Sequence, residues 1–268
     1  MTRRSMLMGV VVLAMMLMAL PAVGITFGEI DGNAHPNVGA LIAEFDVDGG
    51  EKEKYVICSG TLIAPDVFLT ASHCTIGSTD VWVSFDSAIV EPVTTGLFAG
   101  TAYTNEDFGV QGGGADWHDI GVVILDEPGP DDPPLPDIDP AELPTEGLLD
   151  DMKAAKSLRD ETFTAVGYGS VRDDKTGGFH PLYWDPVRRF ADQTLLSLQK
   201  TVLGLSMQPS TGDGGTCYGD SGGPHFLGDM VVSITVSGDA PCRATDKTYR
   251  LDTPSARAFL QQFDVILP

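Results

Sequence analysis

Basic side chains are scarce in this chain of 268 residues. Sixteen lysines and arginines stand against 38 aspartates and glutamates, and the formal net charge is −22. Nucleic acids and anionic membrane surfaces are themselves negatively charged and would repel such a protein. We therefore expect neither as a partner, and the acidity is explained most simply by solubility.

The apolar run at the start of the chain is too short to span a bilayer comfortably. After the basic opening of residues 1–5, it extends from Met6 to Leu20 and is followed by Pro-Ala-Val-Gly at residues 21–24. Spanning takes about 20 apolar residues. A basic start, a short apolar core and small residues before the cleavage point are typical of a secretory signal peptide. We predict a signal peptide over 1–24 and an exported protein without stable membrane association; a retained anchor is the alternative.

Cysteine is limited to four residues, Cys58, Cys74, Cys217 and Cys242. No two of them have the close spacing of a zinc-binding pair, so we predict no metal site. In an exported protein, four cysteines predict two disulfide bonds, and the sequence alone leaves three pairings open.

Helical periodicity is scarce, whereas short β-branched and aromatic runs bounded by Gly, Asp and Pro recur along the chain. This pattern favours an all-β fold of antiparallel barrels or sandwiches over a parallel α/β sheet. Thr253, followed by proline and a run of helix formers, predicts a short C-terminal helix. The predicted strands are 38–45, 55–63, 67–70, 81–85, 120–125, 163–168, 194–202, 230–236 and 248–251.

A proline-rich and acidic stretch divides the predicted mature chain into halves of similar size. Residues 126–147 hold seven prolines, which is typical of an extended linker. We therefore predict one β domain over 25–125 and a second over 148–268 that ends in the helix.

A serine in a glycine-rich turn is the most informative motif of the chain. Residues 217–224 read Cys-Tyr-Gly-Asp-Ser-Gly-Gly-Pro. A serine hydroxyl is a weak nucleophile until a base removes its proton and nearby donors stabilise the oxyanion that it creates. Glycines let backbone N–H groups approach a carbonyl substrate. The motif predicts a nucleophile at Ser221; a serine in an ordinary exposed turn is the alternative.

A histidine and an aspartate precede this serine in the chain. His73 lies in the segment Thr-Ala-Ser-His-Cys of residues 70–74, and Asp119 directly precedes the apolar run of residues 120–125. Neutral imidazole can accept the serine proton, and a carboxylate can orient the imidazole. We predict His73 as general base and Asp119 as the orienting acid. A structural histidine and the rival carboxylate Asp116 are the alternatives.

The three motifs and their order resemble the trypsin/chymotrypsin family of serine endopeptidases. The resemblance covers the chain from about Ile25 to the C-terminus. It implies two antiparallel six-stranded β-barrels, with His73 and Asp119 from the first and Ser221 from the second. Such an enzyme hydrolyses proteins or peptides, needs no cofactor, and is expected to be a monomer.

The resemblance also implies features around the serine. The disulfide pairs would be Cys58–Cys74 and Cys217–Cys242. The backbone N–H groups of Gly219 and Ser221 would form the oxyanion hole, where the charge of the tetrahedral intermediate is stabilised.

The primary specificity pocket departs from that of trypsins. Six residues before the nucleophile, where trypsins carry Asp, this chain has Gly215, so we expect no preference for Arg or Lys before the scissile bond. Gly238 matches the pocket-wall glycine, although the family's Ser-Trp before it reads Val-Ser here. Lys247 falls near another lining position, where its charge would favour acidic substrates; a solvated lysine is the alternative.

Activation in the family depends on a freed N-terminal Ile, whose amino group pairs with the Asp before the nucleophile. Ile25 directly follows the predicted cleavage point here. We predict that signal removal alone creates an ion pair between Ile25 and Asp220. The alternative is cleavage elsewhere, with Ile25 an ordinary strand residue.

Two other functions stay open at this point. One is a catalytically inactive relative that serves as a binding module. The other is an esterase, because Gly219 and Gly223 flank Ser221 in the Gly-x-Ser-x-Gly pattern of enzymes built on an α/β sheet. The order of the three motifs and the lack of βαβ alternation favour the endopeptidase.

Overall fold

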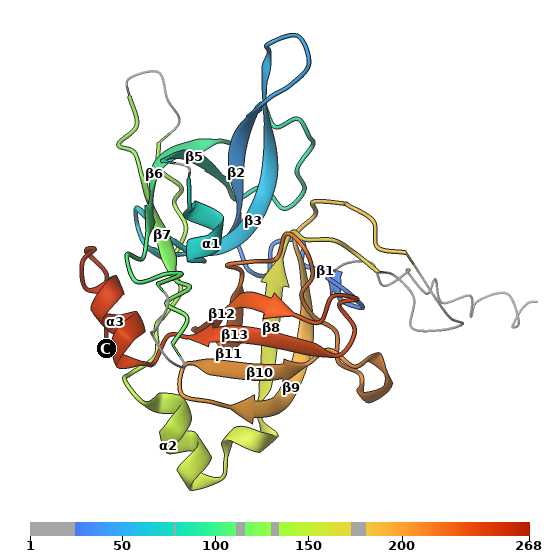
Figure 1. The fold of residues 1–268 in the computed structure, drawn as a ribbon, viewed down its shortest axis with the longest axis vertical. Helices are drawn as coiled ribbons and strands as arrows, with labels where there is room; N and C mark the ends of the chain where they lie inside the picture. Colours follow the sequence, from blue (N-terminus) through green and yellow to red (C-terminus); the bar gives the residue numbers. More distant parts are fainter. Residues whose placement is uncertain (1–24, 78, 111–115, 130–133, 173–180) are drawn as a thin grey trace, which may run out of the picture.

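The computed structural model describes residues 25–77, 79–110, 116–129, 134–172 and 181–268, and the predicted signal peptide lies outside them. These residues form mainly antiparallel strands in two barrels, one above the other in Figure 1. The strands are β1 (Glu29–Ile30), β2 (Val38–Asp46), β3 (Lys52–Ala64), β4 (Val67–Thr70), β5 (Asp80–Ser84), β6 (Phe98–Thr104), β7 (Gly121–Leu125), β8 (Thr162–Gly167), β9 (Arg189–Leu198), β10 (Val202–Ser206), β11 (Pro224–Leu227), β12 (Met230–Gly238) and β13 (Thr245–Arg250). The helices are α1 (Ser72–Thr75), α2 (Leu148–Ala155) and α3 (Pro254–Leu260), with two 3-10 turns at Leu158–Asp160 and Pro209–Thr211.

The first barrel closes in the order β2-β3-β4-β7-β6-β5. Its interior holds fully buried aliphatic and aromatic side chains such as Leu41, Leu62, Phe68 and Val122. Because a closed barrel leaves no unpaired strand edge, every backbone group along these strands finds a neighbour. The barrel therefore gives a rigid base for the loops at its ends.

The second barrel consists of β8, β9, β10, β13, β12 and β11, and it closes because β8 pairs with both β9 and β11. The prediction of two antiparallel six-stranded barrels is thus confirmed. The doubly wound parallel sheet of an esterase is excluded, since every pair between named strands is antiparallel in the described ranges.

Each end of the described chain packs on the barrel built from the other half of the sequence. At the start, β1 pairs with β9 of the second barrel, although it lies within the range 25–125 predicted for the first. At the end, α3 follows the second barrel, and the ring of Phe263 just beyond it lies 5.4 Å from that of Tyr103 on β6. Contacts made by the two ends of the described chain therefore hold the two barrels together.

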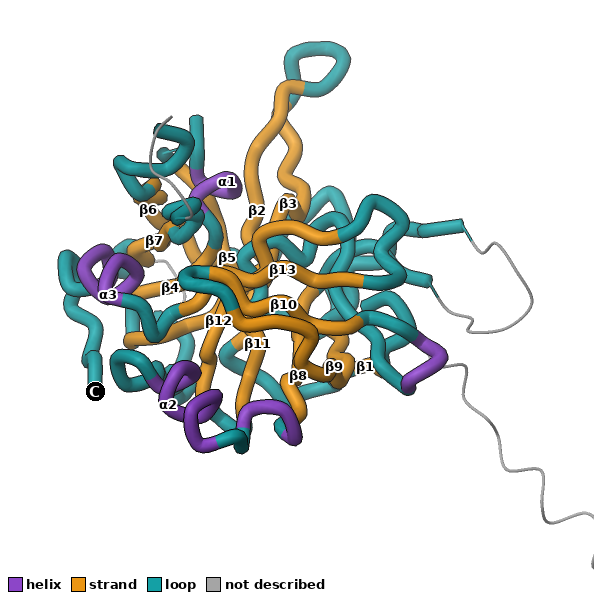
Figure 2. The backbone as a smooth tube through the Cα atoms, turned by 60° about the horizontal axis from the view of Figure 1, so that its bottom comes forward, coloured by secondary structure: helices purple, strands orange, loops and turns teal. Residues whose placement is uncertain are grey.

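The predicted C-terminal helix is present as α3, and the side chain of Thr253 caps it by accepting a hydrogen bond from the N–H of Ala256 at 3.3 Å. The helix α2 was not predicted. Figure 2 shows both helices outside the strands. In the described part of the chain no helix has the length and apolar character needed to cross a membrane.

A buried arginine joins the barrels and the N-terminal segment. The guanidinium of Arg188 donates to the carboxylate of Asp31 at 2.9 Å and to the carbonyls of Val38 and Phe85, each at 3.0 Å. Both charged side chains are fully buried. Asp31 also bonds to His35. Pairing and complete hydrogen bonding are what make a buried charge of this kind tolerable.

Candidate active site

His73 and Asp119 meet because the strands beside them are paired. Thr70, the last residue of β4, lies opposite Gly121, the first residue of β7. His73 follows this point in α1 and Asp119 precedes it, so both emerge at the same end of the first barrel. The Oδ2 atom of Asp119 accepts a hydrogen bond from Nδ1 of His73 at 2.8 Å, and Oδ1 accepts one from the His73 backbone N–H at 3.0 Å.

These two bonds determine which ring nitrogen carries the hydrogen. A carboxylate can only accept, so Nδ1 of His73 must be the donor and Nε2 is left with a free lone pair. The Asp119 side chain is 8% exposed, whereas that of His73 is 32% exposed and accessible to a substrate. The pair has the chemistry of a general base held by a buried acid.

The rival carboxylate, Asp116, forms its side-chain hydrogen bonds with residues other than His73. It accepts hydrogen bonds from the Tyr249 hydroxyl at 2.8 Å and from the Ser255 hydroxyl at 2.7 Å. Burial would raise the pKa of Asp116, but the bonds from Ser255 and Tyr249 outweigh it, and the pKa is lowered. Asp116 therefore ties the first barrel to the second barrel and α3.

The Ser221 turn packs directly against the strand end that precedes His73. The N–H of Ser59 on β3 donates to the Ser221 carbonyl at 2.9 Å. Gly222 has a φ of +77°, and a Cβ there would lie 2.7 Å from the nitrogen of Ala71 and clash with the Thr70 hydroxyl. Only glycine allows this approach.

Ser221 itself is partly exposed. Among the described residues, no hydrogen bond joins its hydroxyl to His73. Such bonds are often long before substrate arrives and tighten only in the complex. The packing of the turn against β3 and β4 nevertheless brings the serine and histidine segments side by side.

Two backbone N–H groups of the turn are free to bind a ligand. In the described part of the chain, neither Gly219 nor Ser221 donates its N–H to a protein acceptor. Gly219 has a φ of +97°, and its carbonyl is held by the Ser59 hydroxyl at 3.0 Å. The hydrogen bond to the Gly219 carbonyl holds the turn, while the N–H groups of Gly219 and Ser221 stay available, as an anion site requires.

Asp220 is fully buried between these two residues. Its carboxylate accepts N–H groups of Gly169 at 2.7 Å and Cys217 at 2.8 Å. Burial raises the pKa of Asp220 to about 7, and the two N–H donors offset only part of this. Because desolvation outweighs these bonds, the buried carboxylate is costly to ionise.

Ile25 is likewise buried, and it packs with Ala165 and Ala191 in the second barrel. The next residue, Thr26, bridges to Gly215 in the loop that leads to the serine. In the full-length chain the Ile25 nitrogen belongs to a peptide bond, so the predicted ion pair with Asp220 requires cleavage before Ile25.

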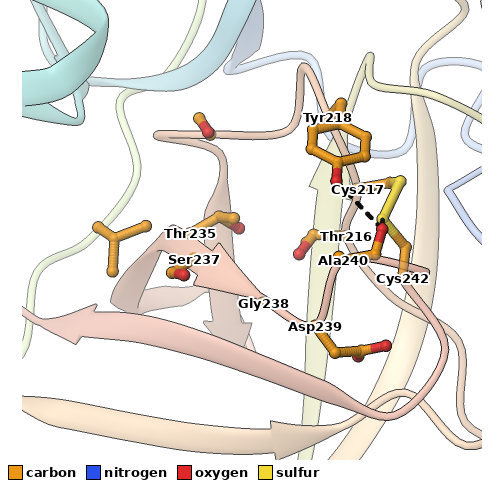
Figure 3. A pocket seen from close by; sticks show the side chains of 11 residues that line it. Thr216, Cys217, Tyr218, Thr235, Ser237, Gly238, Asp239, Ala240 and Cys242 are labelled. Carbon is orange, nitrogen blue, oxygen red and sulfur yellow. Dashed lines mark hydrogen bonds between the residues drawn. A yellow bond between two sulfur atoms is a disulfide. The ribbon is translucent and has the colours of Figure 1, made fainter.

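A cavity of about 250 Å³ opens beside Ser221 (Figure 3). The Cys217–Cys242 disulfide lies on one side of it, where the Tyr218 hydroxyl also donates to the Ala240 carbonyl at 3.1 Å. The lining residues are Thr216, Cys217, Tyr218, Ser221, Thr235, Val236, Ser237, Gly238, Asp239, Ala240 and Cys242.

Of the three residues predicted for the pocket, Gly238 lines this cavity. Gly215 directly precedes the lining residue Thr216 but does not itself line the cavity. The space beside it is filled, since the Met207 sulfur would lie 2.7 Å from a Cβ placed on Gly215. Lys247 is exposed on β13 and does not line the cavity. The prediction that Lys247 lines the pocket is therefore corrected. Neighbouring side chains on a strand point to opposite faces, and here Asp246 points inward while Lys247 points outward.

Sequence reasoning missed the buried polar side chains behind this cavity. Asp246, His225 and Gln193 have no exposed surface. Asp246 is hydrogen-bonded to Gln193 and Thr216, His225 is hydrogen-bonded to Thr235, and the two groups meet where Nε2 of His225 lies 3.6 Å from Oδ2 of Asp246. His225, four residues after Ser221, is fully buried. No local signal in the sequence pointed to these side chains, because they come from three separate strands, β9, β11 and β13.

The second disulfide, Cys58–Cys74, lies beside His73. Donor atoms of these three residues come within 4.8 Å of one another. Both sulfurs are bonded in the disulfide, however, and a metal requires the thiolate. The cluster is therefore a brace for the histidine segment and does not fit a metal.

Comparison with known proteins identifies the family. The sequence profile described as Trypsin matches residues 30–260. The chain belongs to the trypsin family. It is a serine-type endopeptidase, which hydrolyses peptide bonds in protein substrates. Two disulfides are typical of the secreted members of such families.

Individual trypsin-family relatives are distant. Kallikrein 1-related peptidase b11 of Mus musculus is 22% identical over 236 residues, which cover 81% of this chain and 86% of that protein. The structure of HL collagenase superposes with a TM-score of 0.60 at 17% identity, over 86% of this chain and 94% of that one. A mutant of human heparin binding protein gives 0.61 at 17% identity, over 89% and 96%. These structures share the fold.

Proposed function

We propose that this chain is an exported, monomeric endopeptidase that works through an acyl-enzyme, with Ser221 as nucleophile, His73 as general base and Asp119 as the orienting acid. The observation that carries the proposal is the double hydrogen bond from His73 to Asp119. It leaves Nε2 of His73 as the one ring nitrogen able to take a proton.

In the acylation step, Oγ of Ser221 attacks the carbonyl carbon of the scissile bond while its proton passes to Nε2 of His73. The resulting imidazolium is stabilised by Asp119. The tetrahedral oxyanion binds the free N–H groups of Gly219 and Ser221. When the C–N bond breaks, the imidazolium gives its proton to the leaving amine, and the acyl group remains on Ser221 as an ester.

In the deacylation step, water attacks the ester carbonyl and transfers a proton to Nε2 of His73. The C–O bond to Ser221 breaks, the proton returns to the Ser221 oxygen, and the carboxylic acid leaves. Each residue ends as it began. No group outside the chain, the substrate and water is required.

The experiment that tests this proposal is peptide hydrolysis by matched variants. Ser221→Ala and His73→Ala should each lower kcat by about 10⁴–10⁶, and the double variant should be no worse than either, because triad residues act as a unit. The exposed Ser157 gives the control Ser157→Ala, which should keep full activity. Substantial activity in purified Ser221→Ala would contradict the mechanism.

For substrate choice, we propose that Arg and Lys are not preferred at P1, the residue before the scissile bond. Gly215 supplies no carboxylate to the pocket, and the space for one is filled by Met207. An acidic P1 residue is not favoured either, because Lys247 is exposed outside the cavity. We therefore expect an uncharged side chain at P1.

For activation, we propose that export frees Ile25, whose ammonium group then pairs with Asp220. Two observations support this: Ile25 is buried within the second barrel, and the carboxylate of Asp220 forms no ion pair among the described residues, where its hydrogen bonds come from backbone N–H groups. Breaking such a buried pair costs about 3–5 kcal/mol. N-terminal sequencing of the active enzyme should give Ile25; another start with full activity would contradict it.

A further inference from the structure

A buried polar network stands behind two residues of the specificity pocket. The Thr216 hydroxyl donates to Oδ2 of Asp246 at 2.7 Å. The Thr235 hydroxyl lies 2.9 Å from Nε2 of His225. Both threonines line the cavity (Figure 3). Asp246 and His225 have no exposed surface. Within this network only the two threonines line the cavity, so a substrate would contact the network through their hydroxyl groups.

Asp246 determines what Thr216 offers to the pocket. Its carboxylate also accepts a hydrogen bond from the side-chain amide of Gln193 at 3.1 Å. A carboxylate can only accept, so the single hydroxyl hydrogen of Thr216 is committed to Asp246. Towards the cavity Thr216 presents a lone pair, and it acts there as a hydrogen-bond acceptor.

His225 determines what Thr235 offers. Burial lowers the pKa of His225, so its ring is neutral and carries one hydrogen. The Nε2 atom lies 3.6 Å from Oδ2 of Asp246, and this negative charge favours the hydrogen on Nε2. The other tautomer would bury an N–H at Nδ1, which has no partner among the described residues.

With its hydrogen on Nε2, His225 donates to the Thr235 oxygen. The hydroxyl hydrogen of Thr235 is then left for the cavity, so Thr235 acts as a donor there. The pocket wall thus holds one acceptor, Thr216, beside one donor, Thr235. A primary carboxamide carries the complementary pair, an NH₂ donor and a carbonyl acceptor, on one planar group.

Charged side chains fit this wall poorly. A carboxylate would meet the negative charges of Asp246 and of Asp239, which also lines the cavity. An ammonium group would find no free carboxylate oxygen, because Asp239 is engaged by backbone N–H groups of residues 243–245 and Asp246 is sealed from the cavity. Its desolvation would not be offset.

We propose that the pocket selects a primary carboxamide side chain, glutamine or asparagine, at P1, and that Asp246 and His225 are positioning residues that set this preference by orienting the hydroxyl hydrogens of Thr216 and Thr235. The inference rests on the proposed function, because it assumes that the cavity beside Ser221 receives the P1 side chain.

The test uses four peptides that differ only at P1, which is Gln, Glu, Met or Lys. Hydrogen-bonding sites reject analogues that lack the partner by large factors, so kcat/KM for Gln should exceed that for the isosteric Glu and for Met by about tenfold or more. A higher value for Glu, Met or Lys overturns the proposal. So does a failure to cleave any of the four by an enzyme whose Ser221 still reacts with a fluorophosphonate. If Ser221 does not react either, the proposed function itself fails.

Variants separate positioning from folding. Thr216→Val and Thr235→Val keep the side-chain shape, so each should lower the Gln-to-Met ratio of kcat/KM about tenfold. Thr216→Ser, which keeps the hydroxyl, should restore the ratio, and Thr162→Val, at an exposed position on β8, should not change it. Because a ratio is independent of the folded fraction, Asp246→Asn can be judged in the same way. An unchanged ratio in Thr216→Val and Asp246→Asn would overturn the proposal.

Discussion

Asp119 receives two hydrogen bonds from one residue, the ring and the backbone N–H of His73, at 2.8 and 3.0 Å. The backbone bond holds the carboxylate in place independently of the ring. The ring bond keeps the hydrogen on Nδ1. The general-base nitrogen is therefore available without any rearrangement of the first barrel.

The first prediction compares the two aspartates near His73. Asp119→Asn should lower kcat by about 10⁴ with the fold intact, because the amide can stabilise the wrong tautomer of the histidine and cannot balance the imidazolium. Asp116→Asn is the matched control, since Asp116 bonds to Tyr249 and Ser255. It should change stability more than kcat. The reverse order, measured by kinetics and thermal unfolding, would assign the role to Asp116.

The second prediction concerns the glycine after the nucleophile. Gly222→Ala should lower the free energy of unfolding by about 3 kcal/mol or more and abolish activity, because its φ of +77° is strained for alanine and the methyl group would clash with Thr70. Gly228→Ala is the control: its φ is +62°, but nothing lies within 4 Å. It should cost about 1–2 kcal/mol and leave activity intact. Equal effects in chemical denaturation would show that the packing at Gly222 is unimportant.

The third prediction is an acid-dependent loss of stability through Asp31. Burial would raise the pKa of Asp31, but hydrogen bonds from His35 and Arg188 outweigh it and lower the pKa to about 2. A carboxyl whose pKa is lowered on folding stabilises the protein above its unfolded pKa of about 3.9, and this contribution is lost as the pH falls through about 2.

The free energy of unfolding should therefore fall by about 2 kcal/mol more in the wild type than in Asp31→Asn between about pH 4 and pH 2. Asp31→Asn should also be less stable at neutral pH, because it leaves Arg188 buried without its counter-charge. The exposed Asp229 gives the control Asp229→Asn, which should follow the wild type. Parallel curves for the wild type and Asp31→Asn would contradict the account.

The fourth prediction concerns the missing carboxylate of the pocket. Gly215→Asp should not create a preference for Arg or Lys at P1. The new side chain would collide with Gln193 and with the Met207 sulfur, 2.7 Å from its Cβ, so it cannot reach the cavity without moving the wall. Overpacking of this kind typically costs about 1–3 kcal/mol of stability. A stable variant that cleaves after Arg or Lys would contradict this prediction, because it would show that the pocket wall can move to admit the new side chain.

The sequence was sufficient for the three motifs and for an all-β antiparallel fold because these signals are local, whereas the two closed barrels were implied only by the family resemblance. Asp119 stands directly before a buried strand, and Ser221 lies among glycines that only a close approach of chains requires. The strand alternation is equally local. Each of these features can be recognised without knowing which strands are neighbours.

The boundaries were less predictable where a turn lacks its usual residues. The predicted strand 194–202 runs across the hairpin between β9 and β10, because the turn at residues 199–201 contains neither glycine nor proline. The strands β6 and β11 were not predicted. β6 consists mainly of small residues, which give a weak strand signal. β11 begins within the serine motif, so its first residues were assigned to the turn.

The network behind the pocket could not be predicted from local signals. It depends on β13 lying beside β12 and β10, which brings Asp246 to His225 and Gln193 from separate parts of the chain. The sequence position expected to line the pocket was assigned to Lys247, which is one residue after Asp246 and lies on the opposite face of the strand. In a strand, an error of one position reverses the direction of the side chain.

The most direct test of the central claim is the reaction of the purified protein with a fluorophosphonate, followed by mass spectrometry of its peptides. The account predicts one phosphonyl group per active chain, attached to Ser221, with loss of peptide hydrolysis in proportion to labelling. In His73→Ala the labelling rate should fall by several orders of magnitude, because the serine is activated by its base. Full hydrolysis without labelling of Ser221, or labelling at another serine, would contradict the account.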